Sequence, residues 1–176
     1  MKAAAVPAFV PITFTPAVRA AQAQARSREQ FAGLDAAGEA GAVRAPRIEG
    51  PVADWLRRAD SFFVATVSSS GWPYVQHRGG APGMLRVVDE RHFEFDDVAG
   101  NGQMITVGNL RDNDRVMLIF VDYEQRARLK LWGRATVSEL TPDEPDYDRR
   151  VRRIRIRLEA ASFNCSAFIP QMVRFE

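Results

Sequence analysis

The stretch FFVATVSSSGWPYVQHRGG, residues 62–80, decides the fold of this chain. Residues 62–68 are mostly apolar, aromatic or β-branched, which is typical of a β-strand. Residues 69–71, SSG, carry a turn signal, and residues 72–79 return as a second strand. The stretch therefore predicts a β-hairpin.

The chain that follows this hairpin continues the β pattern. Residues 85–88 and 92–95 predict a second hairpin, and the apolar run within residues 115–121 predicts a buried strand. Residues 128–139 predict a further strand. In residues 153–158, RIRIRL, apolar side chains and arginines alternate, so they fall on opposite faces of a half-buried strand. About six or seven strands at hairpin spacing indicate a closed or nearly closed antiparallel barrel.

The N-terminal third of the chain lacks the β pattern and divides the sequence into three parts. Residues 1–13 predict a flexible leader. Residues 14–60 predict a helical segment packed on the barrel, and residues 61–176 predict the barrel domain itself.

Helices and loops are indicated by their start and stop signals. Thr15 followed by Pro16 is typical of a helix start, and residues 52–59 predict a short helix that leads into the core. The glycines of residues 33–50 predict a loop. Later in the chain the pattern predicts a glycine-rich loop at 100–102, a short helix at 104–110 and an acidic surface excursion at 141–150.

Composition excludes several classes of protein. Hydrophobic residues make up 46% and charged residues 26% of the 176 residues, which is typical of a globular domain. A single cysteine rules out an intrachain disulfide, and with two histidines it makes a structural zinc site improbable, so no metal site is expected. We expect a cytoplasmic protein. Residues 2–14 loosely resemble a signal peptide, but Pro7 and Pro11 interrupt the apolar stretch.

Neither a membrane nor a nucleic acid is expected as a partner. No apolar run approaches the roughly 18 residues needed to cross a bilayer. The net charge is only +2, and the arginines of residues 149–157 follow directly on the acidic residues of 143–148. No aromatic residues interleave these arginines, as single-strand binders usually require.

Several motifs, taken in order, resemble the pyridoxamine 5'-phosphate oxidase-like family of FMN-binding split barrels. Each motif alone is weak, whereas their order and spacing are fairly specific, and the match runs from about residue 14 to the C-terminus. The fold class that this implies is mainly β (α+β), a six-stranded antiparallel split β-barrel with peripheral helices. The motifs are FVATV at 63–67, GWPYVQHRGG at 71–80, FEFDD at 93–97, GNGQ at 100–103, GNL at 108–110, DRV at 114–116, RLKLWGRA at 128–135 and NC at 164–165.

The resemblance also implies where FMN lies. The strand along the flavin ring corresponds to Gln76, His77, Arg78 and Gly79, and the phosphate loop corresponds to Asn101, Gly102 and Gln103, preceded by Asp96 and Asp97. On a later strand Arg128 would reach the flavin. The family is dimeric, so a second copy would contribute Phe163 and Asn164. Lys130 shares a strand face with Arg128, and this charged face either meets the anionic cofactor or is solvated.

Two departures from the family pattern affect the functional prediction. Gly102 and Gln103 stand where the family usually has an arginine in the phosphate loop, and residues 168–172 lack the family's pyridoxal phosphate ligands. We therefore expect an FMN-dependent oxidoreductase that acts on an unidentified small molecule, with an electron donor such as NAD(P)H, rather than an enzyme of vitamin B6 oxidation. No catalytic residue is assigned. The alternative is a non-catalytic module that binds or stores a flavin, a deazaflavin or haem.

Overall fold

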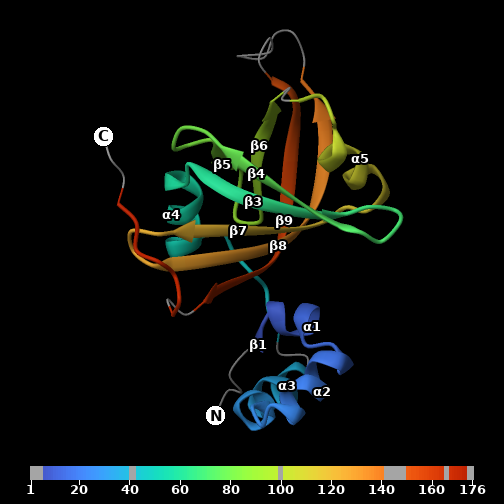
Figure 1. The fold of residues 1–176 in the computed structure, drawn as a ribbon, viewed down its shortest axis with the longest axis vertical. Helices are drawn as coiled ribbons and strands as arrows, with labels where there is room; N and C mark the ends of the chain where they lie inside the picture. The colour runs from blue at the N-terminus through green and yellow to red at the C-terminus, as the bar shows by residue number, and fades with distance from the viewer. Residues whose placement is uncertain (1–5, 40–42, 99–100, 141–149, 165–166, 174–176) are drawn as a thin grey trace.

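A computed structural model describes residues 6–39, 43–98, 101–140, 150–164 and 167–173 of the chain. Within them a single antiparallel sheet of seven strands, in the order β4-β3-β7-β8-β9-β6-β5, curls into a barrel (Figure 1). The strands are β3 (Ser61–Val67), β4 (Pro73–Gly79), β5 (Leu85–Val87), β6 (His92–Val98), β7 (Arg115–Asp122), β8 (Ala127–Glu139) and β9 (Arg150–Asn164).

The predicted class, an antiparallel split barrel with peripheral helices, is confirmed. The sheet has seven strands rather than six. The resemblance implied six, whereas the residue pattern predicted all seven, including β5 in the stretch 85–88, which pairs with β6 over only three residues at the edge of the sheet. A strand this short adds one ladder to an edge without changing how the barrel closes.

The barrel core follows from the alternation along each strand. Ile154, Ile156 and Leu158 of β9 are buried, while Arg155 and Arg157 between them point outward. Leu129 and Leu131 of β8 are likewise fully buried. A period of two places every second side chain on the same face, so the hydrophobic positions of all the long strands meet inside the barrel.

Two helices cover the barrel at separate places. Helix α4 (Gly50–Arg58) buries Trp55 and Leu56 against the core. Helix α5 (Ile105–Asp112) contacts β3 and β8, and its buried Asn109 donates a side-chain hydrogen bond of 2.9 Å to Thr66 of β3. This bond satisfies two buried polar groups and fixes the position of α5 on the barrel.

The N-terminal residues differ from the predicted leader. Residues 1–5 lie outside the described residues, whereas the rest of the stretch forms β1 (Val6–Pro7) and α1 (Phe9–Thr13). The Phe9 ring stacks on Trp132 of β8, with centroids 6.2 Å apart and an interplanar angle of 18°. The predicted leader therefore folds because an aromatic ring finds a partner on a strand that is remote in the sequence.

The helices that follow confirm one prediction and correct another. Helix α2 (Pro16–Gln24) begins as predicted, with the Thr15 side chain accepting a hydrogen bond from the Val18 amide at 3.3 Å. The predicted loop at 33–50 instead contains α3 (Ala32–Glu39) and β2 (Val43–Arg44), with a 3₁₀ turn at Arg28–Phe31 before them. Asp35 of α3 forms ion pairs with Arg19 and Arg28, and these tertiary contacts outweigh the low helix propensity of the glycines.

Predictions on the remaining segments were confirmed or lie outside the described part. Helix α5 and strands β7 and β8 occupy the predicted stretches within one or two residues. Of the excursion predicted at 141–150, residues 141–149 lie outside the described residues, as do Gly100 and Cys165, whereas Arg150 begins β9 (Arg150–Asn164). Among the described residues, no helix has both the length and the apolar character needed to cross a bilayer.

Candidate functional site

The barrel is split between β4 and β6, which are not joined by a ladder. A buried ion pair crosses this split. The Arg78 guanidinium of β4 lies 2.7 Å from the Asp97 carboxylate of β6, and the Asp97 side chain is only 6% exposed. Arg78 also borders two pockets, one on each side of the ion pair, that together occupy the split.

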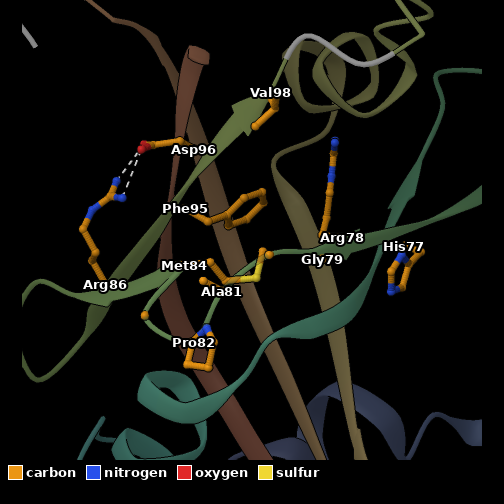
Figure 2. Close-up of a pocket in the computed structure, with 12 residues that line it drawn as sticks. His77, Arg78, Gly79, Ala81, Pro82, Met84, Arg86, Phe95, Asp96 and Val98 are labelled. Atoms are coloured by element: carbon orange, nitrogen blue, oxygen red, sulfur yellow. Dashed lines mark hydrogen bonds and ion pairs between the residues drawn. The ribbon is translucent and has the colours of Figure 1, made fainter. Parts of the chain in front are cut away.

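The first pocket, which we call the link pocket, follows the chain between β4 and β5. It has a volume of about 480 Å³. Met84 and Phe95 supply apolar side chains to its wall, and Gly79 and Gly80 supply exposed backbone (Figure 2). Its size and its mostly apolar wall suit a small organic ligand. The lining residues are His77, Arg78, Gly79, Gly80, Ala81, Pro82, Gly83, Met84, Arg86, Phe95, Asp96 and Val98.

The second pocket, which we call the loop pocket, lies between β4, the end of β6 and the start of α5. It has a volume of about 160 Å³ and a polar wall. Gln76 lines it from β4 and accepts a hydrogen bond of 2.5 Å from the Tyr74 hydroxyl. Its lining residues are Tyr74, Gln76, Arg78, Asp97, Val98, Asn101, Gly102, Gln103, Met104, Ile105, Thr106 and Val107. Arg78 and Val98 line both pockets, so the two adjoin.

Two residues of the loop at 101–104 have a positive φ, in the left-handed region of backbone conformation. Gly102 has φ +75° and Met104, the residue before α5, has φ +54°. The Asn101 side chain accepts a hydrogen bond of 3.1 Å from the Gln103 amide. A methionine in this region is strained, and such strain is often found at ligand-binding loops.

Alternation along β6 separates the two predicted acidic residues. Asp97 faces the split, whereas Asp96 points to the other face of the strand and forms an ion pair with Arg86 at 2.7 Å (Figure 2). A second ion pair joins Asp96 to Arg153 at 3.1 Å. The Asp96 side chain is only 4% exposed. Burial raises the pKa of Asp96, but the hydrogen bonds from Arg86 and Arg153 outweigh it and hold the pKa below its ordinary value.

This network predicts a loss of stability in acid. Since the folded-state pKa of Asp96 lies below the ordinary value of 3.8, its stabilisation is present above that pH and is lost as the pH falls through the folded-state pKa. Replacing Arg86 with glutamine should lower the free energy of unfolding by about 1 kcal/mol at pH 7, a modest value because Arg86 is partly exposed. Urea titrations should show this difference shrinking as the pH falls below the ordinary pKa of 3.8.

The matched control removes an arginine whose ion pair is open to solvent. Arg57 and its partner Asp54 are 64% and 67% exposed, so Arg57→Gln should change stability little at any pH. An Arg86→Gln effect that stays constant from pH 7 to acid would contradict the proposed role of Asp96.

The structure divides the predicted cofactor residues into three sets. Gln76, Arg78, Asp97, Asn101, Gly102 and Gln103 come together around the loop pocket, as the order of the motifs implied. His77, Gly79 and Asp96 border the link pocket. Arg128, Lys130, Phe163 and Asn164 line neither pocket, and they lie where β8 pairs with the end of β9.

The last set lies beside a partly apolar outer face of the sheet. The ladders place Arg128 and Lys130 opposite Val121 and Ile119 of β7, and Ile119 lies opposite Phe63 of β3. Phe63 is 37% exposed and its ring contacts His77, with centroids 5.3 Å apart. His77 therefore belongs both to the rim of the link pocket and to this outer face.

Sequence reasoning missed the apolar wall of the link pocket. Phe95 falls in a predicted strand, where an apolar residue is typical of a core, and Met84 lies just before the predicted hairpin in a stretch with no predicted role. Tyr74 of the loop pocket is predictable from the sequence. It belongs to the Pro-Tyr pair of the second strand and points to the same side as Gln76. Phe95 belongs to the hydrophobic core as well as to the pocket wall, and Met84 lies outside the strands, so side-chain alternation does not identify either as a pocket residue.

The antiparallel barrel with one split places the chain in the class of split-barrel proteins. The family model described as pyridoxamine 5'-phosphate oxidase matches residues 48–168. The chain therefore belongs to the pyridoxamine 5'-phosphate oxidase family.

Solved structures with the same fold are distant in sequence. A variant of HupZ from group A Streptococcus is 21% identical over 66% of this chain and 99% of that one, with a TM-score of 0.53. The conserved hypothetical protein Rv2991 from Mycobacterium tuberculosis is 14% identical over 76% and 96% of the two chains, with a TM-score of 0.51. Among curated proteins, none matches this sequence.

Proposed function

We propose that this protein binds FMN in the split of the barrel and acts as an oxidoreductase on a small molecule, with NAD(P)H as a candidate electron donor. The observation that carries the proposal is the pair of adjoining pockets on either side of Arg78. One is large and mostly apolar, and the other is small and polar. This matches a cofactor with a flat apolar ring and a polar, phosphorylated tail. Members of the family commonly bind flavins.

The residues of each pocket fit a different part of the cofactor. Met84 and Phe95 of the link pocket offer apolar surface to a ring, while Gly79 leaves the backbone open to close approach. In the loop pocket Gln76 and Gln103 offer amide donors, and the first turn of α5 offers backbone N–H groups to a phosphate. FMN, when bound, supplies hydride or electron transfer, while the protein positions it and excludes water.

A second copy of the chain completes the proposed site. The outer face of β3, β4 and β7 exposes Phe63 by 37% and Val75 by 59%, and Phe163, near the end of β9 and paired with Leu129, is 50% exposed on the other face of the sheet. An apolar surface of this kind on an open sheet is typical of an interface. We expect a homodimer in which this face is covered and in which Phe163, Asn164, Arg128 and Lys130 approach the flavin of the other copy.

The first test is the spectrum and mass of the purified protein. Flavin absorbance bands and an FMN mass should accompany the protein through gel filtration, and sedimentation should show a dimer at micromolar concentration. A colourless protein that takes up no FMN, or a monomer at that concentration, would refute the proposed site.

A tryptophan at Ala81 should fill the link pocket and block FMN. Ala81 lies on the exposed link between β4 and β5 and borders the pocket (Figure 2), so the larger side chain does not disturb the core. We expect Ala81→Trp to raise the Kd for FMN by more than about tenfold. Titration of flavin fluorescence measures it, and Ala23→Trp on the exposed surface of α2 serves as the control. Equal affinities in both variants would place the ring elsewhere.

A module that binds or stores a flavin, a deazaflavin or haem without turnover is the second candidate. It is favoured by the pairing of Arg78 with Asp97, which leaves the phosphate end of the proposed site without a free cation among the residues that line it. Stopped-flow mixing with NADH or NADPH separates the two candidates. Rapid, saturable reduction of the bound flavin supports the oxidoreductase, and inertness toward both donors supports the module.

A further inference from the structure

The charges around the loop pocket cancel. Of the residues that line it, only Arg78 and Asp97 are charged, and they pair with each other at 2.7 Å. Ala99 and Gly100, which precede the loop in the sequence, carry no charge. A phosphate group in this pocket would therefore meet one cation and one anion among the lining side chains, while Arg152, whose guanidinium lies 3.7 Å from Sδ of Met104, is paired with Glu139.

The carboxylate of Asp97 is buried in the wall of this pocket. Its side chain is 6% exposed, and that of Arg78 is 21% exposed. Solvent therefore screens the pair only weakly, so the repulsion between Asp97 and a phosphate would persist. Asp97 pairs with Arg152 of β9 just before the register shifts between Asp97 and Val98, so the ladder holds its backbone on the side of Asp96.

Arg78 keeps one donor available for a neutral acceptor. Its Nε atom is buried and has no hydrogen-bond partner in the described structure, whereas a terminal nitrogen of the guanidinium forms the ion pair with Asp97. A buried donor without a partner is costly, and a ligand oxygen that accepts from it removes that cost. A hydroxyl or carbonyl oxygen satisfies this atom as well as a phosphate oxygen, because the charge of Arg78 is already balanced by Asp97.

We infer that Asp97 is a specificity-determining residue that makes the site accept flavins with and without a phosphate. The inference rests on the proposed flavin site and specifies its ligand class. In this class the flavin ring and its hydroxylated chain supply most of the binding affinity, and the phosphate adds little to it. Asp97 acts by neutralising Arg78, which is the one basic side chain lining the loop pocket.

The test compares riboflavin with FMN for the wild-type protein and for Asp97→Asn. Kd values from flavin fluorescence should differ by less than about tenfold between the two ligands in the wild type. Asp97→Asn keeps the shape of the side chain and releases Arg78. It should tighten FMN binding by at least about tenfold and change riboflavin binding by less than about threefold.

The matched control is Asp112→Asn. It makes the same change of net charge on the exposed surface of α5, outside both pockets, and should leave both Kd values unchanged. Raising the salt concentration should weaken FMN binding to Asp97→Asn more than to the wild type, because only the variant offers a net positive charge to the phosphate.

Three results would overturn the inference. A wild type that prefers FMN to riboflavin by more than about a hundredfold would show that Asp97 does not offset Arg78, and this measurement does not depend on a folded variant. An Asp97→Asn variant that shifts both ligands equally would show that Asp97 does not act through the phosphate. In both cases the proposed flavin site stands, whereas failure of both ligands to bind any form of the protein would refute the flavin site as well.

Discussion

Gly133→Ala is expected to lower the free energy of unfolding by about 3 kcal/mol, through overpacking between two central strands. A Cβ atom at this position would lie 2.5 Å from Cγ2 of Ile156 and 2.6 Å from the carbonyl oxygen of Arg157. The register of β8 and β9 shifts between Trp132 and Gly133. At this β-bulge the backbone of β9 passes close to Gly133. A backbone carbonyl in a ladder cannot yield without weakening the pairing around it.

Gly108→Ala is the control that separates this steric effect from the general effect of replacing a glycine with alanine. Gly108 lies inside α5, and a Cβ atom added there would have no atom of another part of the chain within 4 Å. Alanine is favoured over glycine in a helix interior, so Gly108→Ala should stabilise the protein by about 0.5–1 kcal/mol. Urea unfolding followed by circular dichroism measures both variants. A Gly133→Ala variant as stable as the wild type would show that the close crossing is not present in solution.

Phe62→Ala is expected to cost about 3–5 kcal/mol, because it opens a cavity at the centre of the barrel. The Phe62 side chain is 1% exposed. Its ring packs against Phe95 with centroids 5.1 Å apart and against Phe120 with centroids 5.5 Å apart. These rings come from three strands, so the surrounding backbone cannot collapse into the space that alanine leaves.

Phe168→Ala removes the same ring from the surface and is the control. Phe168 is fully exposed, with a relative accessibility of 101%, so its loss should change stability by less than about 0.5 kcal/mol. Thermal and urea unfolding of both variants provide the measurement. Similar small losses for the two substitutions would mean that the aromatic cluster does not form the core of the barrel.

The strands and their faces were predictable because side-chain alternation is a local property. The pattern of β9 predicted which of its residues are buried, and Thr15 with Pro16 predicted the start of α2. The loop pocket was predictable in part. Motif order placed Gln76 and Asn101 in one site, and the structure brings both to that pocket.

Other features depend on contacts between segments that are remote in the sequence. The α1 helix forms where the prediction had a leader, because Phe9 stacks on Trp132. The glycines of α3 were interpreted as a loop signal, whereas the ion pairs of Asp35 support a helix. Neither partner is visible in a window of neighbouring residues, so local propensity alone led to the wrong prediction.

By itself the sequence determined the antiparallel strand pattern, the buried side of strands such as β9, and some of the residues that border the split, among them Gln76 and Asn101. Only the tertiary structure decided that Arg78 pairs with Asp97 and that Arg128 and Lys130 lie apart from the loop pocket within one chain. The physical reason is that alternation depends on adjacent residues. Whether β4 lies beside β6, in contrast, depends on how the twisted sheet curls and closes. Every strand contributes to that closure.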